Sequence, residues 1–435
     1  MLKLKTDSNV KKISLNIELE FNSDSMFEIE EKILEVLKNA GKDLTREVLK
    51  DFDTNGEAIL VEGKKHTSKG MQTEYYETLY GKIEVERHVY QGTSGGKTFC
   101  PMENQANMIL NSTPKYARAI SYLYAQTGGV AVAESLKEIV GRVACPTYMK
   151  KISDSIGEEA LIHEESFEYD LPNEIDDIAS ISIGLDGTCM LMAKDGWREA
   201  MAGTISLFND IGERQYTIYV GATPEYGKAT FLSRLDDEVK KIKAKFPDAI
   251  YIGVADGAPE NWKFLNPRVS KCVLDYFHAS EYVKLAAKSI YPKQKDEEKR
   301  KKWIKDELHK LKHNKGGAKR FLNLIISYQE KVYKKNLDNL KKVITYFSNN
   351  YKKMIYADQT KNNLSIGSGV TEAACKELIK ARFGRSGMRW KNKGAASVLA
   401  TRSLTMTKGR WGAFWNKILK KGTVNKKNIT DITQN

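Results

Sequence analysis

Cysteine is scarce in this chain of 435 residues, and the few cysteines follow no pattern. The five of them are scattered, their number is odd, and no two form a Cys-x-x-Cys pair. A disulfide framework and a structural zinc site are therefore not expected, and a reducing cytoplasm is the compartment that suits the chain best.

Long apolar runs are also missing. No stretch approaches the roughly 18–20 consecutive apolar residues that a membrane-spanning helix needs, and the first residues, Met-Leu-Lys-Leu-Lys-Thr-Asp, lack the apolar segment of a signal peptide. We therefore expect no membrane partner and a cytoplasmic location. The composition, 41% hydrophobic and 29% charged, is that of a globular protein long enough for two or three domains.

Acidic residues are sparse in the C-terminal third, which concentrates the net charge of +14 there. Residues 284–353 hold 21 Lys and Arg against 7 acids, and residues 376–421 hold 13 against one. Basic surfaces of this kind suit a polyanion, although a lysine-rich helical face also serves as a solvated surface. For the second run we favour nucleic acid, because arginine is the better phosphate ligand.

The N-terminal part divides into two predicted regions. Residues 1–110 predict an α/β region with a helix over 25–52 and a strand over 81–89. Residues 111–165 predict three short helices, the third starting at Pro146 and ending at Gly157.

Helix-turn-helix spacing is present in this three-helix region, and its third helix carries basic side chains. Lys150 and Lys151 are therefore candidate DNA-binding residues. Three helices packed together without touching DNA fit the same pattern equally well, so both interpretations stay open.

Alternating strands and helices characterise the part after residue 175. Apolar runs predict strands over 178–186, 197–208, 215–220, 249–256 and 271–275, with a helix over 227–246. The order β-β-β-α-β-α-β is that of the ribonuclease-H-like fold, an α/β class with a mixed sheet and helices on its faces. We expect a first part of a catalytic core over 175–282, a basic helical insertion over 283–363, the last core helix with a basic C-terminal region over 364–420, and a flexible tail over 421–435.

Two carboxylates follow neighbouring strands of this predicted sheet. Asp186 and Asp256 each end an apolar strand and precede a glycine, which lets a ligand approach the backbone closely. Carboxylates that converge repel one another, and Mg²⁺ is the usual remedy. Glu372, in the first turns of a glycine-introduced helix, is the candidate third ligand because the helix dipole keeps it ionised; Glu377 is the nearby alternative.

Three such carboxylates can hold two Mg²⁺ ions about 3.5–4 Å apart, with Mn²⁺ as a possible substitute. One ion then activates a water or a 3′-hydroxyl and the other stabilises the leaving oxygen of an in-line displacement at phosphorus. The same site can hydrolyse one DNA strand and join the freed end to another.

Four sequence blocks resemble bacterial insertion-sequence DDE transposases of the ISKra type. They are Leu-Asp186-Gly-Thr with the following Gly196-Trp-Arg-Glu-Ala, Val-Ala-Asp256-Gly-Ala-Pro-Glu-Asn-Trp262, Leu-Asp275-Tyr-Phe-His278-Ala-Ser-Glu-Tyr, and Gly367-Ser-Gly-Val-Thr-Glu372 with Ser-Gly-Met-Arg-Trp390. The resemblance implies that Asp186, Asp256 and Glu372 are the metal-binding catalytic triad. It also implies cleavage and strand transfer at the ends of the element, and a homodimer or higher assembly on DNA.

The third block contains Asp275-x-x-His278, which is similar to a signature of the distantly related Mutator-like transposases. His278 is therefore a candidate catalytic residue that contacts the scissile phosphate, and a histidine hydrogen-bonded to backbone at the sheet edge is the structural alternative. Further candidate DNA contacts lie on or after the Glu372 helix. One of them is a tryptophan, which could stack on a base, although tryptophan more often packs in a core. The candidates are Arg382, Arg385, Arg389, Trp390 and Lys391.

Two other functions stay open at this point. A ribonuclease-H-like nuclease or resolvase would cut DNA without strand transfer, but such enzymes are usually smaller and lack a large basic insertion. A domesticated, inactive transposase would only bind DNA.

Overall fold

The computed structural model describes residues 3–7, 10–175, 177–422 and 432–434, and it forms two compact units. The first comprises residues up to 167 together with those from 412 onward, and the second comprises residues 168–411. None of the helices in these described ranges has the length and apolarity needed to cross a lipid bilayer.

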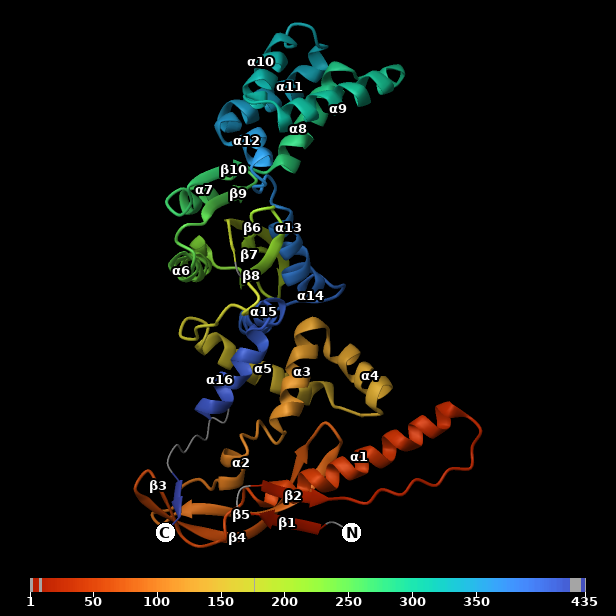
Figure 1. Cartoon of the computed structure of the whole chain (residues 1–435), viewed down its shortest axis with the longest axis vertical. Coiled ribbons are helices and arrows are strands. Elements are labelled where there is room, and N and C mark those ends of the chain that lie inside the picture. Colours follow the sequence, from red (N-terminus) through yellow and green to blue (C-terminus); the bar gives the residue numbers. More distant parts are fainter. Residues whose placement is uncertain (1–2, 8–9, 176, 423–431, 435) are drawn as a thin grey trace. The chain divides into compact units, whose positions relative to one another are not determined.

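The first unit contains a four-stranded antiparallel sheet and a long helix (Figure 1). The sheet order is β11-β3-β4-β5, and β1 and β2 form a separate hairpin. The predicted helix and strand of this region are confirmed as α1 and β5. The elements are β1 (Lys3–Asp7), β2 (Val10–Ser14), α1 (Met26–Lys50), β3 (Ile59–Val61), β4 (Lys64–Glu77), β5 (Lys82–Gly92), α2 (Pro101–Gln105) and β11 (Ile432–Gln434).

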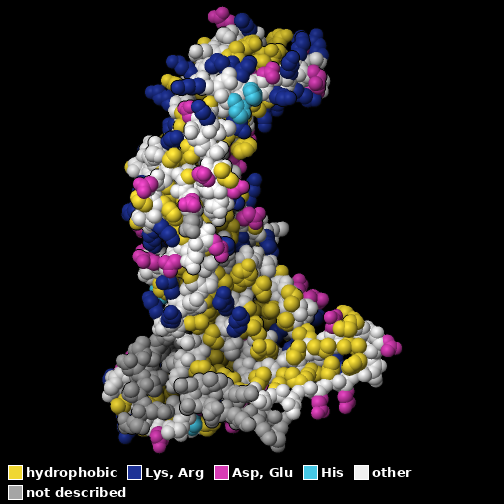
Figure 2. Space-filling view, viewed as in Figure 1, with side chains coloured by type: hydrophobic (Ala, Val, Ile, Leu, Met, Phe, Trp, Pro, Cys, Tyr) yellow, Lys and Arg dark blue, Asp and Glu magenta, His cyan; other side chains and the backbone are white. Residues whose placement is uncertain are grey.

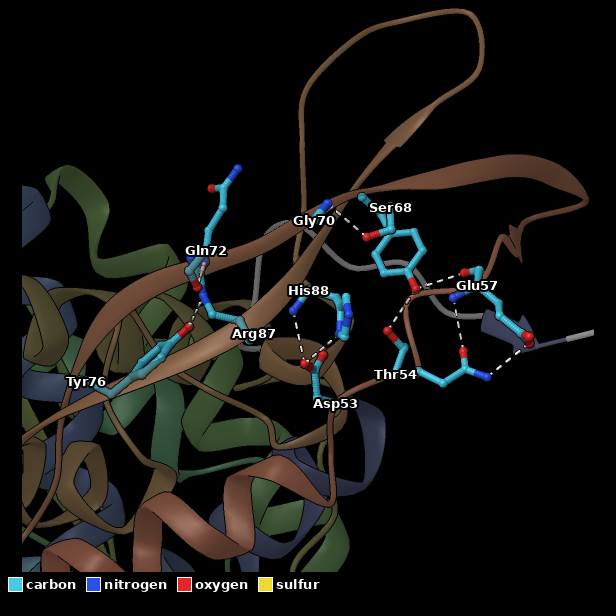
Figure 3. A network of polar contacts seen from close by, with 11 residues as sticks. Asp53, Thr54, Glu57, Ser68, Gly70, Gln72, Tyr76, Arg87 and His88 are labelled. Atoms are coloured by element: carbon cyan, nitrogen blue, oxygen red, sulfur yellow. Dashed lines mark hydrogen bonds and ion pairs between the residues drawn. The ribbon is translucent and has the colours of Figure 1, made fainter.

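A polar network ties the segment after α1 to the sheet (Figure 3). Asp53 accepts hydrogen bonds from the His88 backbone N–H, at 2.9 Å, and pairs with the ring Nδ1 at 3.0 Å. Arg87 donates to the Tyr76 hydroxyl at 3.1 Å, which joins β5 to β4. These partly buried hydrogen bonds hold the segment after α1 against β5 and join β5 to β4.

Three helices, α3 (Pro114–Gln126), α4 (Gly129–Val140) and α5 (Pro146–Ile162), complete this unit with most of α16 (Arg410–Lys421). α4 ends at Gly141, which has the left-handed φ of 57° that favours glycine at a helix end. The predicted end of the third helix at Gly157 is wrong, because α5 continues to Ile162. Gly157 is buried, and tertiary packing outweighs its weak helix propensity.

A five-stranded mixed sheet forms the centre of the second unit, in the order β10-β9-β6-β7-β8. β6, β7 and β8 are antiparallel neighbours, while β9 lies parallel to both β6 and β10. The predicted α/β class with a mixed sheet is confirmed. The elements are β6 (Ser180–Met192), β7 (Gly196–Phe208), β8 (Arg214–Ala222), η1 (Tyr226–Lys228), α6 (Ala229–Lys245), β9 (Ile250–Ala255), α7 (Pro259–Leu265) and β10 (Lys271–Leu274).

A helical segment follows the sheet, and its helices pack through apolar residues such as Phe321, Leu340 and Phe347. Its elements are α8 (Tyr276–Ile290), η2 (Gln294–Asp296), α9 (Glu297–His313), α10 (Gly317–Ser327), α11 (Lys334–Asn350), η3 (Tyr351–Lys353) and α12 (Tyr356–Lys361). The chain then returns to the sheet through α13 (Gly369–Ala374), the π-helix η4 (Cys375–Lys380), α14 (Ala381–Phe383) and α15 (Asn392–Met406).

The tail predicted over residues 421–435 lies largely outside the described residues. Its described part consists of the end of α16 and of β11, which pairs with β3.

Candidate metal centre

Asp186 and Asp256 lie on adjacent strands of the second unit. The parallel pairing of β6 with β9 ends at Gly184 and Val254, two residues before each aspartate. Asp256 directly follows β9, as predicted, and Gly257 turns the chain there with a φ of +112°. The two aspartates therefore occupy equivalent positions on adjacent strands, just beyond the point where the pairing of β6 with β9 ends.

Asp186 differs from the prediction in one respect, because it does not end its strand. β6 continues to Met192 in antiparallel register with β7, with Asp186 opposite Ala202. Only the parallel partner β9 stops short, which exposes the edge of β6 at Asp186. The aspartate is thus held within a continuous strand, and a rigid strand positions a ligand better than a loop does.

Burial raises the pKa of Asp186, and the charge of Asp256 raises it further. The Gly187 N–H, which donates to Asp186 at 2.7 Å, lowers that pKa, as do the Cys375 thiol and the charge of His278. Two carboxylates in one partly desolvated site favour protonation unless a cation joins them.

Glu372 enters the same region from α13, a short helix anchored on the sheet. The neighbouring Thr371 hydroxyl is hydrogen-bonded to that of Thr204 on β7 at 2.7 Å. The Ser368 hydroxyl lies within hydrogen-bond distance of the Glu372 carboxylate, at 3.1 Å, and of the Asp275 carboxylate, so the two carboxylates share its single hydrogen. Burial raises the pKa of Glu372, the neighbouring Asp275 raises it further, and Ser368 and His278 lower it.

Asp275, His278 and Glu372 form a cluster whose potential ligand atoms all lie within 4.8 Å of one another. Asp275 is fully buried after β10 and caps α8, accepting a hydrogen bond from the Phe277 N–H at 2.7 Å. The Asp-x-x-His spacing is visible in the sequence, but Asp275 was not predicted to be a ligand. The signal was a carboxylate that ends a buried strand one helical turn before His278.

Two side chains link this cluster to the aspartate pair. The charge of His278 lowers the pKa of both Asp186 and Glu372. The Cys375 thiol donates to Asp186 at 3.6 Å, and burial raises the pKa of this thiol, with Asp186 and Glu372 adding to the effect. The described residues therefore place two carboxylates and an imidazole within ligand distance of one another, and Asp186 and Asp256 are connected to this cluster through Cys375 and through the charge of His278. Carboxylate oxygens are the ligands that Mg²⁺ and Mn²⁺ prefer.

Glu377, the alternative third ligand, lies in the π-helix and is exposed. Its backbone carbonyl accepts a hydrogen bond from Arg402. Ser368 and Asp275 both lie close to the carboxylate of Glu372, so Glu372 is a better candidate for the third ligand than Glu377.

His278 is partly exposed, and its Nδ1 lies 3.9 Å from the Glu281 carboxylate. This contact differs from the backbone hydrogen bond of the structural alternative. An accessible imidazole beside carboxylates is a candidate for contact with a ligand.

The backbone of Trp390 pairs with the last residues of β6, beyond Asp186. Its backbone N–H donates to Leu191 at 3.0 Å, and its carbonyl accepts from Ala193 at 2.8 Å. The Arg382 guanidinium lies 4.8 Å from the centre of its ring and is only 1% exposed. Arg382 is therefore a packing partner of Trp390 in this structure and not an open phosphate contact.

The other predicted DNA contacts are exposed. Arg385, Arg389 and Lys391 surround Trp390 in the sequence, and all three side chains reach solvent. Lys150 and Lys151 are exposed on α5 of the first unit, where Lys150 pairs with Asp154 one turn away. Lysine and arginine side chains also gather over the helical segment α8 to α12 (Figure 2).

No known protein family and no curated protein matches this chain. The function therefore has to be argued from the site itself, that is, from the donor set and the charge around it.

Proposed function

We propose that this chain is a DDE transposase that cuts DNA at the ends of its own element and joins those ends to target DNA. The observation that carries the proposal is the cluster of Asp275, His278 and Glu372, whose ligand atoms lie within 4.8 Å of one another. The Cys375 thiol, three residues after Glu372, reaches Asp186 at 3.6 Å, and the charges of Asp256 and His278 act on Asp186, which supports placing the two aspartates at the same site. The sheet order β10-β9-β6-β7-β8, with helices returning to it, supports a ribonuclease-H-like core.

Asp186, Asp256 and Glu372 would hold two divalent ions, which when bound supply the activation of an attacking hydroxyl and the stabilisation of the leaving oxygen. The protein orients these carboxylates through its own hydrogen bonds. Asn261 donates to Asp256 at 3.3 Å, and the Ser368 hydroxyl lies between Glu372 and Asp275, which share its hydrogen. Such supporting partners fix the direction in which each carboxylate presents its oxygens.

Asp275 is a positioning residue in this proposal. It is fully buried, caps α8 and shares Ser368 with Glu372. His278 projects from the first turn of α8 and is the candidate for contact with the scissile phosphate. The basic helical segment and Arg385, Arg389 and Lys391 would bind the DNA backbone, and a homodimer or larger assembly in the cytoplasm would pair two element ends.

The decisive assay combines purified protein, element-end DNA and a target plasmid in the presence of Mg²⁺. Strand-transfer products support a transposase, cleavage alone supports a nuclease, and binding without either supports a DNA-binding protein. We expect Asp186→Asn, Asp256→Asn and Glu372→Gln each to abolish products while leaving DNA binding intact. Glu377→Gln, an exposed change in the following helix, is the matched control and should remain active.

A further inference from the structure

A cleft of about 1130 Å³ opens beside Asp256 in the second unit. Gly257 and α7 form one wall, and α8, α11 and η3 form the others. Gly257, which directly follows Asp256, lines the cleft, so the cleft begins one residue away from a proposed metal ligand.

The cleft is basic. Lys263, Lys341, Lys342 and Lys353 line it, against the two acids Glu281 and Asp338. Within the described part of the chain, none of the four lysines forms an ion pair with an acid. Their charges are therefore available to an anionic ligand.

Two buried hydrogen-bond donors in the cleft wall have no partner among the described residues. They are the Trp262 indole N–H, on a side chain only 6% exposed, and the Tyr346 hydroxyl. Leaving a buried donor unpaired costs about 1–3 kcal/mol. An indole N–H can only donate, so a ligand group that reaches Trp262 has to be a hydrogen-bond acceptor.

An aromatic pair completes the lining. The rings of Tyr282 on α8 and Tyr346 on α11 are stacked, with centroids 3.7 Å apart and planes 7° apart. Aromatic rings can stack on an unpaired base, because the flat face of such a base is not covered by a neighbouring base. The bases of a duplex are already stacked on one another, so a duplex offers no such face.

We propose that this cleft binds unpaired nucleotides of a single DNA strand next to the metal centre, with a base on the Tyr282–Tyr346 pair and phosphates on Lys341 and Lys342. The inference rests on the proposed function for its DNA substrate. It adds that part of the substrate is unpaired when bound, and it names the surface that holds this part.

Fluorescence anisotropy with the full chain and a labelled oligo-dT of about 12 nucleotides tests the inference. The assay contains EDTA, so binding is measured without strand cleavage. We expect the double variant Lys341→Gln/Lys342→Gln to weaken binding roughly tenfold and to reduce the slope of log affinity against log salt by about 1.4, since each phosphate contact on a single strand contributes about 0.7. Tyr346→Phe, which keeps the ring and removes only the hydroxyl, should weaken binding about threefold or more.

The matched control is Lys334→Gln/Lys335→Gln, which removes the same charge from exposed positions of the same helix outside the cleft. It should change the affinity less than about twofold. An equal loss in both double variants overturns the proposal, as does equally tight binding of a duplex of the same length. Displacement of the oligonucleotide by dTMP at an equal concentration also overturns it, because the site would then hold a free nucleotide.

The two proposals fail in different ways. Oligo-dT binding that depends on Lys341 and Lys342, in a protein that cuts no DNA, keeps the cleft and refutes the transposase. Strand transfer by a protein whose oligo-dT binding does not depend on Lys341 and Lys342 supports the transposase and refutes the cleft proposal.

Discussion

Replacing Gly184 with alanine should move the candidate ligand Glu372 away from the candidate ligand Asp186. Gly184 lies on β6 two residues before Asp186, where α13 packs directly on the strand. A Cβ at Gly184 would lie 2.0 Å from the Thr371 hydroxyl oxygen, 3.2 Å from the Thr371 Cβ and 3.3 Å from the Thr204 hydroxyl oxygen. Thr371 precedes Glu372, so Gly184→Ala acts as a wedge between the sheet and the glutamate.

The size of the effect follows from these distances. Ordinary contact begins near 3.4 Å, so the Thr371 oxygen would have to move by about 1.4 Å. Rotating the threonine side chain relieves that overlap but leaves the tight Cβ contact and breaks the 2.7 Å hydrogen bond to Thr204. Overpacking of this kind typically costs about 1–3 kcal/mol of stability, and a misplacement of about 1 Å at a catalytic group costs on the order of 100-fold in rate.

Thermal unfolding and Mg²⁺-dependent DNA cleavage measure the two effects. Gly253→Ala is the control: it lies on the adjacent strand β9, and its Cβ would meet Leu265 on α7 at 3.1 Å, away from Glu372. It should lose some stability and keep its cleavage rate per folded molecule. Gly184→Ala with Thr371→Ala should recover part of the lost rate. Wild-type stability and cleavage in Gly184→Ala would refute the packing argument.

Three further predictions concern ions and protons at the site. If the Kd for Mg²⁺ is about 1 mM, 10 mM Mg²⁺ should stabilise the protein by about 1.4 kcal/mol, or roughly 3–5 °C in thermal melts, and Asp186→Asn should abolish this shift while Glu377→Gln retains it. In EDTA, the free energy of unfolding should fall as pH rises from the ordinary carboxyl pKa through the raised pKa values of Asp186 and Glu372, because the folded state binds those protons more tightly. Thermal melts at a series of pH values measure this, and an Asp186→Asn variant with the wild-type pH dependence would contradict it. Asp275→Asn, which removes a charge but keeps a capping oxygen, should raise the Mg²⁺ concentration needed for cleavage about 10–100-fold, and an unchanged Mg²⁺ titration would leave Asp275 with a capping role alone.

Much of the second unit could be predicted from the sequence because its strands are continuous apolar runs. A run such as Ile250–Ala255 is recognised locally, and an aspartate directly after it lies at the sheet edge whatever the tertiary packing. The extent of β6 could not be predicted in this way. Its continuation past Asp186 depends on the hairpin with β7, which pairs Met192 with Gly196 and is not visible in the apolar pattern of either strand.

The environment of each charged side chain was harder to predict than the strands. Arg382 stands in an arginine-rich run and reads as a phosphate contact, yet its guanidinium is buried over the Trp390 ring. Asp275 was recognised only as part of an Asp-x-x-His spacing, and nothing in that spacing shows that it is fully buried beside Glu372. Both outcomes depend on a partner that is distant in sequence or on another element, so composition alone cannot separate a buried charge from an exposed one.

The π-helix after Glu372 shows how such a distant partner can shape the site. A helical spacing of 3.6 residues predicts a regular helix here, but residues 375–380 form a π-helix, in which hydrogen bonds span five residues and not four. Arg402 on α15 donates to the Leu378 carbonyl at 2.8 Å and to the Glu377 carbonyl, so it supplies donors within the irregular turn. Burial lowers the pKa of Arg402 to about 10, which still leaves it charged at neutral pH. The widened turn begins at Cys375, the residue whose thiol meets Asp186, and π-helical turns occur often at functional sites because they change which side chains share a face. Contacts from α15 therefore support the turn that begins at Cys375, whereas Glu372, which precedes this turn, is held against the sheet by the hydrogen bond between Thr371 and Thr204.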